Sequence, residues 1–250
     1  MQVESVTPPA PPGPAHVSCS RCTMGGLCMA GGLRPCEMAR LETIVGGRRT
    51  LMRGEYLHRA GDAFVKLFAI HSGHLKTLRH AHGDCQVTGF PMEGELLGLD
   101  AIADGRHDSD AVALEPCEIC EIPFDRLREL LVAVPSLMDQ FHRALSREIQ
   151  RQQAALFLMG NARAEQRLAL FLVGLRARYA ARGAPSAQIQ LRMSRDDIGA
   201  YLGLTMECVC RLLARFRKAG WITLTGRRLT IVDGPRLAAL AEGVCQEPLP

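Results

Sequence analysis

The chain has 250 residues, and its formal net charge of +4 is too small for a protein that coats nucleic acid along its whole length. It contains no run of roughly 18 apolar residues, the length that a membrane helix needs, and its start lacks the basic and apolar regions of a secretory signal. We therefore expect a cytoplasmic protein of one large or two ordinary domains, with no membrane partner.

The chain begins with a leader and a cysteine-rich segment. Residues 1–18 hold five prolines and little that could form a core, so we predict a disordered leader. In residues 19–40, Cys19, Cys22 and Cys28 are spaced as C-x2-C-x5-C. Three thiolates held this closely need a fourth ligand to close a zinc site or a four-iron cluster, and the alternative is inert thiols. The spacing does not decide the metal, and the candidates for the fourth ligand are Cys36, Cys117 and Cys120.

Ten cysteines are many for a cytoplasmic protein. A reducing compartment argues against a disulfide framework, and crowded thiols there more often indicate metal or redox chemistry. Outside the triplet, four cysteines show no ligand spacing of their own, and ordinary thiols are the simplest interpretation for Cys36, Cys85, Cys208 and Cys245.

Residues 41–130 consist of short apolar runs broken by turn residues, a pattern that favours an all-β barrel or sandwich. Residues 67–70 and 73–78 are predicted to be neighbouring strands. His80 and His82 could grip a metal from one face of a strand, as in cupin enzymes, but no further ligand set accompanies them. We therefore predict a β sensor domain in which both histidines lie in a turn.

A single long helix is predicted within residues 131–160, because no proline or glycine occurs between Pro135 and Gly160. Its apolar side chains fall on one long, narrow stripe, which is typical of a coiled-coil seam between two subunits. The alternative is a helix that packs on its own β domain. The stripe has one polar member, and the predicted dimerisation residues are Met138, Phe141, Leu145, Ile149, Gln152, Leu156 and Met159.

The last part of the chain, residues 161–250, opens with a predicted helix over about residues 161–182. Asn161 can cap this helix and Gly183 can end it. Its buried face is indicated by apolar residues at helical spacing, namely Leu168, Leu172, Leu175 and Tyr179.

Two short helices joined by a glycine turn follow. Ser194 and Asp197 are spaced as a capping box, so a helix begins there. Gly203 breaks it, and Thr205 caps a second helix that ends at Gly220. The second helix has one apolar face and exposes polar and basic residues on its other sides. This arrangement is typical of a helix-turn-helix.

A hairpin with a basic tip follows the two helices. Residues 222–224 and 229–232 predict its strands, and residues 225–228 its tip, which resembles the wing of a winged helix. Between Arg192 and Arg228, Lys and Arg outnumber Asp and Glu by more than two to one. Such an excess suits a surface that faces phosphates, although a solvated face is the alternative.

The second short helix carries candidate base-reading residues. An α-helix fits the major groove, and its N-terminal residues reach the base edges. Arg211 can donate two hydrogen bonds to guanine, and Glu207, one turn earlier, can accept one from cytosine; such a contact discriminates by about 1–3 kcal/mol. The alternative is an ordinary surface ion pair, but the basic wing favours base reading.

Several motifs occur together and in a specific order. They are the C-x2-C-x5-C triplet, AGD with LFAIHSGHLK, TGF, GELLGLDAI, CEIPF and MSRDDIGAYLGLTMECVCRLLARF. In these motifs the chain resembles the CRP/FNR family from Cys19 to about Val232, specifically its FNR branch of anaerobic regulators. The resemblance implies an α+β fold with an N-terminal β-roll (cyclic-nucleotide-binding-like) sensor domain, a long dimerisation helix and a C-terminal winged helix-turn-helix.

The resemblance also implies a cofactor and partners. In the family, the fourth ligand of a [4Fe-4S] cluster is the cysteine directly before EIPF, here Cys120. Oxygen destroys such a cluster and the dimer falls apart, whereas the cluster-bearing homodimer binds an inverted repeat of TTGAT-type half-sites in double-stranded DNA. The family contacts RNA polymerase through a loop that matches Gly98, Leu99 and Asp100. The alternative is a regulator of this family gated by thiol redox, nitric oxide or another ligand, without the cluster.

Three positions depart from the family patterns. Cys210 replaces a serine on the recognition helix, and a thiol is a weaker hydrogen-bond donor than a hydroxyl. Gln152 replaces an acidic residue at the dimer seam, so we predict that this dimer persists better after cluster loss. Residues 107–111 carry carboxylates where cyclic-nucleotide-binding relatives place an arginine, which disfavours an anionic cyclic nucleotide.

Overall fold

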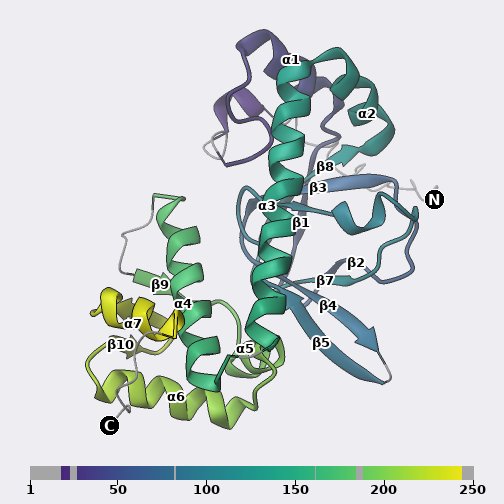
Figure 1. The fold of residues 1–250 in the computed structure, drawn as a ribbon. Helices are drawn as coiled ribbons and strands as arrows, with labels where there is room; N and C mark the ends of the chain where they lie inside the picture. Colours follow the sequence, from purple (N-terminus) through teal and green to yellow (C-terminus); the bar gives the residue numbers. More distant parts are fainter. Residues whose placement is uncertain (1–17, 23–26, 82, 161, 184–187, 244–250) are drawn as a thin grey trace, which may run out of the picture.

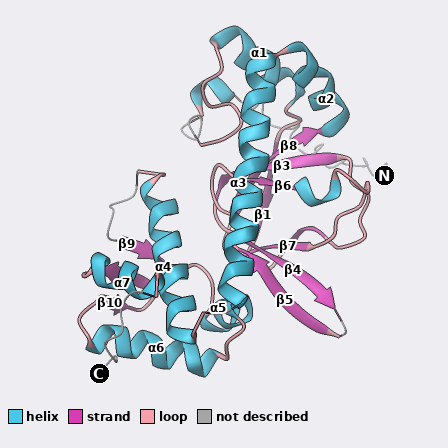
Figure 2. Cartoon of the chain, viewed as in Figure 1, coloured by secondary structure: helices cyan, strands magenta, loops and turns pink. Residues whose placement is uncertain are grey.

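A computed structural model describes residues 18–22, 27–81, 83–160, 162–183 and 188–243. They form a cysteine-bearing N-terminal part, a β domain, one long helix and a C-terminal helical domain with a small sheet (Figures 1 and 2). The predicted leader lies almost wholly outside the described residues, as do His82, Asn161 and Cys245. No helix in the described part of the chain is long and apolar enough to cross a membrane.

The β domain has two four-stranded antiparallel sheets that enclose an apolar core, which confirms the predicted β-roll. One sheet has the strand order β1-β8-β3-β6 and the other β2-β7-β4-β5. The strands are β1 (Arg48–Leu51), β2 (Tyr56–His58), β3 (Lys66–Ser72), β4 (Leu75–Ala81), β5 (Asp84–Gly89), β6 (Leu96–Leu97), β7 (Asp110–Ala113) and β8 (Cys117–Pro123).

Two predictions about this domain are wrong. β3 and β4 follow each other in the chain but belong to different sheets, because the chain crosses from one sheet to the other at Gly73. Gly73 has φ +93° and lies so close to Cys117 that a side chain would collide with it. His80 lies on β4 rather than in a turn, and its Nε2 is 3.1 Å from Oδ2 of Asp110.

Two helices of the N-terminal half were not predicted from the sequence. The first is α1 (Pro35–Ile44), which starts with proline and a capping box between Arg34 and Glu37. The second is α2 (Phe124–Ala133), which continues directly from β8. Both helices pack with the beginning of the long helix into one apolar cluster. The N-terminal segment is therefore folded against the β domain.

The long helix α3 (Pro135–Gly160) has the predicted bounds. It runs from the cluster formed with α1 and α2, past the strands of the β domain, to the C-terminal domain (Figure 1). Its first turns are packed into that cluster through Leu137 and Phe141, whereas farther along Ile149 and Leu156 are 57% and 72% exposed. Packing within the subunit thus accounts for the first turns, and the later part of the apolar stripe is open to solvent.

The C-terminal domain contains the predicted helix-turn-helix and wing. Its elements are α4 (Ala164–Ala180), β9 (Gln188–Gln190), α5 (Arg195–Leu202), α6 (Met206–Lys218), β10 (Ile222–Thr225), β11 (Arg228–Ile231) and α7 (Gly234–Ala241). The three strands form one sheet in the order β10-β11-β9, so the wing hairpin has a third strand that was not predicted from the sequence.

The residues predicted to cap and to end the helices of this domain have these roles in the structure, with one exception. The Ser194 hydroxyl accepts a hydrogen bond from the Asp197 amide at 2.9 Å, and Thr205 accepts one from the Cys208 amide at 3.2 Å. Gly203, with φ +64°, ends α5. The cap position of α4 is occupied by Arg163 instead of Asn161.

Candidate cysteine site and DNA-binding surface

The four cysteines predicted as ligands come from two distant parts of the chain. Cys19 opens the short helix η1 (Cys19–Arg21), Cys22 follows it, and Cys28 lies on the loop that leads toward α1. Cys120 is in the middle of β8. Cys19 and Cys28 pack against the apolar cluster that contains Cys120. The fold therefore brings the N-terminal triplet to the surface of the β domain beside β8.

The four thiols lie within electrostatic reach of one another. Burial is the main cause that raises the pKa of Cys19 to about 12, and the charges of Cys28, Cys120 and Cys22 add to it. Burial also raises the pKa of Cys120, and the charges of Cys28 and Cys22 raise it further. The pKa of Cys28 is raised by burial and by the charge of Cys22. Thiolates at this place are consequently unfavourable unless a positive charge compensates them.

Contacts with α1 and with a turn of the β domain hold the cysteine segment. The amide of Ser20 donates to Oε1 of Glu42 on α1 at 2.7 Å. Leu27 lies so close to Gly94 that a side chain at Gly94 would collide with it. In the described part of the chain, no three His, Cys, Asp or Glu side chains are close enough to hold a metal ion. The four thiols are thus gathered without forming a closed ion site.

The other two candidates for a fourth ligand lie elsewhere. Cys117 is 1% exposed and faces the core between the two sheets, where its Sγ donates to the carbonyl of Glu115 at 3.1 Å. Because side chains alternate along a strand, Cys117 and Cys120 point to opposite faces of β8. Cys36 is exposed on α1. Of the three candidates, Cys120 is the one whose charge acts on Cys19 of the triplet.

Two basic side chains flank the cysteine site, and sequence reasoning missed both. Arg48 on β1 is directly opposite Cys120 in the β1–β8 register, and its guanidinium lowers the pKa of Cys120 against the larger effect of burial. Nδ1 of His71 on β3 lies 3.4 Å from Sγ of Cys22. Only the strand register places these residues beside the cysteines, so spacing along the chain gave no signal for them.

Helix α6 presents the predicted base-reading residues to solvent. The side chains of Glu207 and Arg211 are 86% and 64% exposed, and they form a long ion pair of 3.9 Å. Cys210 is also exposed. The opposite face of α6 is buried in the core of the domain through Val209, Leu212, Leu213 and Phe216. Arg227 and Arg228 add exposed positive charge at the tip of the wing.

Comparison with known proteins decides the family. Residues 166–240 match the Crp-like helix-turn-helix domain, and residues 48–133 match the cyclic nucleotide-binding domain. The chain is 40% identical over 230 residues to the fumarate and nitrate reduction regulatory protein of Escherichia coli (strain K12), which covers 92% of each protein. The chain belongs to the CRP/FNR family. It is also 41% identical over 233 residues to the transcriptional regulatory protein btr of Bordetella pertussis, covering 93% of this chain and 96% of that relative.

The CRP/FNR family consists of dimeric, DNA-binding transcription regulators, and this FNR-like member is accordingly not an enzyme. The structure of FixK2 from Bradyrhizobium japonicum has the same fold, with a TM-score of 0.71 at 22% identity over 77% of this chain and 96% of that one. The predicted combination of β-roll, long helix and winged helix-turn-helix is thus confirmed.

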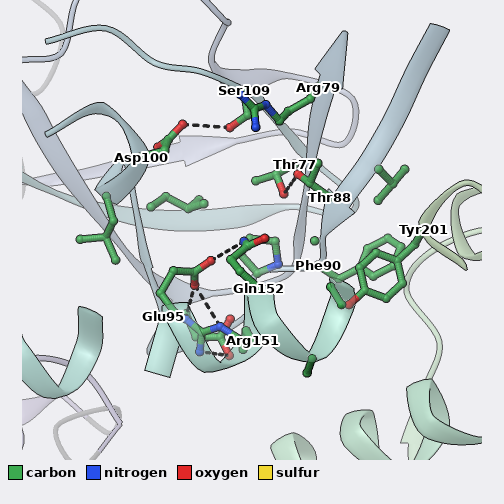
Figure 3. A pocket seen from close by; sticks show the side chains of 18 of the residues that line it. Thr77, Arg79, Thr88, Phe90, Glu95, Asp100, Ser109, Arg151, Gln152 and Tyr201 are labelled. Carbon is green, nitrogen blue, oxygen red and sulfur yellow. Dashed lines mark hydrogen bonds and ion pairs between the residues drawn. The ribbon is translucent and has the colours of Figure 1, made fainter. Parts of the chain in front are cut away.

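A cavity of about 680 Å³ lies between the β domain, α3 and α4 of this CRP/FNR protein (Figure 3). Arg79 lies in its lining and pairs with Asp108 at 2.5 Å. Asp110 accepts a hydrogen bond from the amide of Ala60 at 2.7 Å. The two carboxylates of residues 107–111, Asp108 and Asp110, therefore each have a partner within the domain.

The loop predicted to contact RNA polymerase borders this cavity. Gly98 adopts φ +91° and precedes the short helix η2 (Leu99–Ala101). Asp100 is exposed, and its carboxylate accepts hydrogen bonds from the Ser109 hydroxyl at 3.2 Å (Figure 3) and from the Asp108 amide at 3.1 Å. These two hydrogen bonds hold the loop at Asp100 against residues 108 and 109.

The predicted dimerisation residues are distributed along α3. Phe141 is buried and Met138 and Leu145 are partly buried in the cluster near the cysteines, whereas Ile149, Gln152 and Leu156 are exposed. The side chain of Met159 lies outside the described residues. Nε2 of Gln152 donates to Oε1 of Glu148 at 2.7 Å.

Proposed function

We propose that this FNR-like regulator is an oxygen-responsive global transcription regulator that holds a [4Fe-4S] cluster on Cys19, Cys22, Cys28 and Cys120. The observation that carries the proposal is the approach of the N-terminal triplet to Cys120 across a large distance in the sequence. Four soft thiolates within electrostatic reach of one another match the ligand set of an iron–sulfur cluster. The electrostatic cost of four thiolates there is offset by the iron cations.

The bound cluster would supply an oxygen-labile link between the cysteine segment and β8. The residues of the chain explain how such a link acts at a distance. Cys120 belongs to the apolar cluster that also contains Leu137 and Phe141 of α3. Release of the segment from β8 would loosen the packing on the first turns of α3. Oxygen would thereby change the helix that we propose as the dimer interface.

The remaining site residues have separate tasks in the proposal. Two copies pair through the stripe from Met138 to Met159 on α3, and the exposed Ile149 and Leu156 provide its open apolar part. Glu207, Cys210 and Arg211 on α6 read an inverted repeat of TTGAT-type half-sites. Gly98, Leu99 and Asp100 form the contact with RNA polymerase.

Anaerobic purification tests the cofactor. The protein should be straw-brown, contain iron and sulfide in equal amounts, and show a broad visible absorption that bleaches in air. Colourless protein with stoichiometric zinc would contradict the proposal.

The matched variants Cys120→Ser and Cys117→Ser test the ligand set. We expect Cys120→Ser to lose the colour and the iron, because the fourth ligand is removed. Cys117→Ser should retain both, because Cys117 points to the other face of β8. Loss of the cluster in Cys117→Ser with retention in Cys120→Ser would reassign the fourth ligand.

A further inference from the structure

Strand β8 carries Cys120 between two strands that each bring a basic side chain to the cysteine site. The sheet order β1-β8-β3 places Arg48 on one side of β8 and His71 on the other. Arg48 is directly opposite Cys120, so both side chains lie on the same face of the sheet. His71 falls at an irregularity of the β3–β8 register, between Ile70 and Ser72. The two basic residues therefore approach the cysteines from separate strands.

Glu118 holds both basic side chains. It lies two positions before Cys120 on β8 and thus shares its face. Its Oε2 is 3.5 Å from Nη1 of Arg48 and 3.6 Å from Nε2 of His71. The other ring nitrogen of His71 is 3.4 Å from Sγ of Cys22. Arg48, Glu118 and His71 consequently form a bridge over β8 that begins opposite Cys120 and ends at Cys22.

The guanidinium of Arg48 has a donor that forms no hydrogen bond in the described part of the chain. Its Nε is buried and has no hydrogen-bond partner. Arginine is a donor only and keeps its charge, so its guanidinium can donate to sulfur but cannot accept from a thiol. A surface ion pair with Glu118 alone would contribute little. The position of Arg48 opposite Cys120 gives this cation a specific role beside the thiols.

We propose that Arg48 and His71, held by Glu118, are positioning residues that orient Cys120 and Cys22 and set the oxygen stability of the cluster. This inference rests on the proposed function. Four thiolates give the cluster a net negative charge, and hydrogen bonds to sulfur together with nearby charge set its reduction potential. The fixed positive charge of Arg48 opposes the removal of an electron by oxygen. Its loss should lower the reduction potential and shorten the lifetime of the cluster in air.

The test compares Arg48→Gln, Arg48→Lys and the control Arg49→Gln in the anaerobically loaded full chain. Arg49 is the next residue on β1, and it donates instead to the carbonyls of Tyr56 and Leu57. The readouts are the iron content, the midpoint potential and the rate of bleaching in air-saturated buffer. We expect Arg48→Gln to lower the potential and bleach several-fold faster, Arg48→Lys to lie between it and the wild type, and Arg49→Gln to match the wild type.

His71 is tested in the same way with His71→Asn, which keeps a nitrogen donor near the sulfur, and His71→Leu, which does not. We expect Asn to retain most of the wild-type lifetime and Leu to shorten it. Poor loading of Arg48→Gln with normal loading of Arg48→Lys would also support the positioning role.

The outcomes separate the two proposals. Wild-type protein that binds no iron would overturn both of them. Wild-type protein with a cluster, together with Arg48→Gln and His71→Leu variants of unchanged potential and lifetime, would overturn the positioning role and leave the proposed function intact.

Discussion

The helix-turn-helix with its wing and the cysteine site are built in different ways. The first comes from one continuous stretch of chain, from Ser194 to Ile231, and each helix has its own cap. The second joins an N-terminal loop to the middle of β8 and depends on the packing of α1, α2 and α3 around it. Because its caps are local, the helix-turn-helix should respond less to changes elsewhere in the molecule than the cysteine site, which should respond to any change that loosens the β domain.

The largest expected effect is that of replacing Glu95, which joins the β domain to α3 and to the C-terminal end of α4. This buried carboxylate binds Arg178 of α4 and Arg182, two residues beyond the end of that helix, each at 2.8 Å, and lies 3.6 Å from Arg151 of α3. Burial opposes its ionisation, but the charges of the three arginines lower its pKa. Glu95→Gln leaves these cations without their buried partner, so we expect the free energy of unfolding to fall by about 3–5 kcal/mol.

Urea unfolding of Glu95→Gln measures this change. The control is Asp108→Asn, which removes one partner of an ion pair whose side chains are both more than half exposed. We expect the control to change the free energy by less than about 0.5 kcal/mol. Equal effects in the two variants would show that Glu95 does not stabilise the junction of the β domain with α3 and α4.

Acid should weaken the β domain before it affects the helix-turn-helix. His58 stacks on His107 with ring centroids 3.8 Å apart, and burial, together with the charge of His107, lowers the pKa of His58 to about 4 from 6.5. Between these pH values the unfolded chain binds a proton at His58 that the folded chain does not. Stability is therefore lost as the pH falls through this window, by up to about 3 kcal/mol.

The cap of α5 should behave differently in acid. Burial opposes ionisation of Asp197, but hydrogen bonds from Lys76 and Ser194 lower its pKa below 3.8. Its contribution thus persists until the pH falls through that lower value. Unfolding followed at neutral and mildly acidic pH, in the wild type and in His58→Phe, checks this. A pH slope that His58→Phe does not reduce would contradict the role of His58.

Arg211→Ala examines the DNA-reading region alone. If Arg211 reads a base, the variant should lose about 1–3 kcal/mol of binding to a TTGAT-type site, roughly ten- to a hundredfold in affinity, and far less on random DNA. The control is Arg217→Ala, an exposed arginine on the last turn of α6, which should weaken binding to both DNAs alike. Equal losses on both DNAs for Arg211→Ala would mean that it contacts only phosphate.

The difference between a local unit and a site assembled from distant segments explains how much of the molecule the sequence predicts. Ser194, Gly203 and Thr205 act on neighbouring residues, so their patterns predict α5, α6 and the turn between them. The cysteine triplet can also be predicted from the sequence, because its three residues lie close together in the chain. The choice between Cys117 and Cys120 is not, because it depends on which face of β8 meets the N-terminal loop. For Cys120 the family resemblance supplied what spacing could not.

Other features needed the tertiary structure. Arg48 and His71 are recognisable only from the register of β1 and β3 with β8. β3 and β4 are consecutive runs of similar composition, and nothing local distinguishes a hairpin from a crossing between two sheets. The apolar stripe of α3 predicts a buried face, but its sequence does not show that the first turns pack within the subunit and the later turns stay open.

The smallest expected effect concerns that open part of α3. If two copies pair there, Gln152→Glu places like charges across the seam and replaces the hydrogen bond to Glu148 by repulsion. Exposed charges interact weakly, so we expect a change of about 0.2–1 kcal/mol, at most several-fold in the dimer dissociation constant of the apoprotein. The control Gln150→Glu adds the same charge at an exposed position off the stripe. Light scattering of wild-type apoprotein at micromolar concentration should show a dimer; a clean monomer would mean that Gln152 does not preserve association after cluster loss.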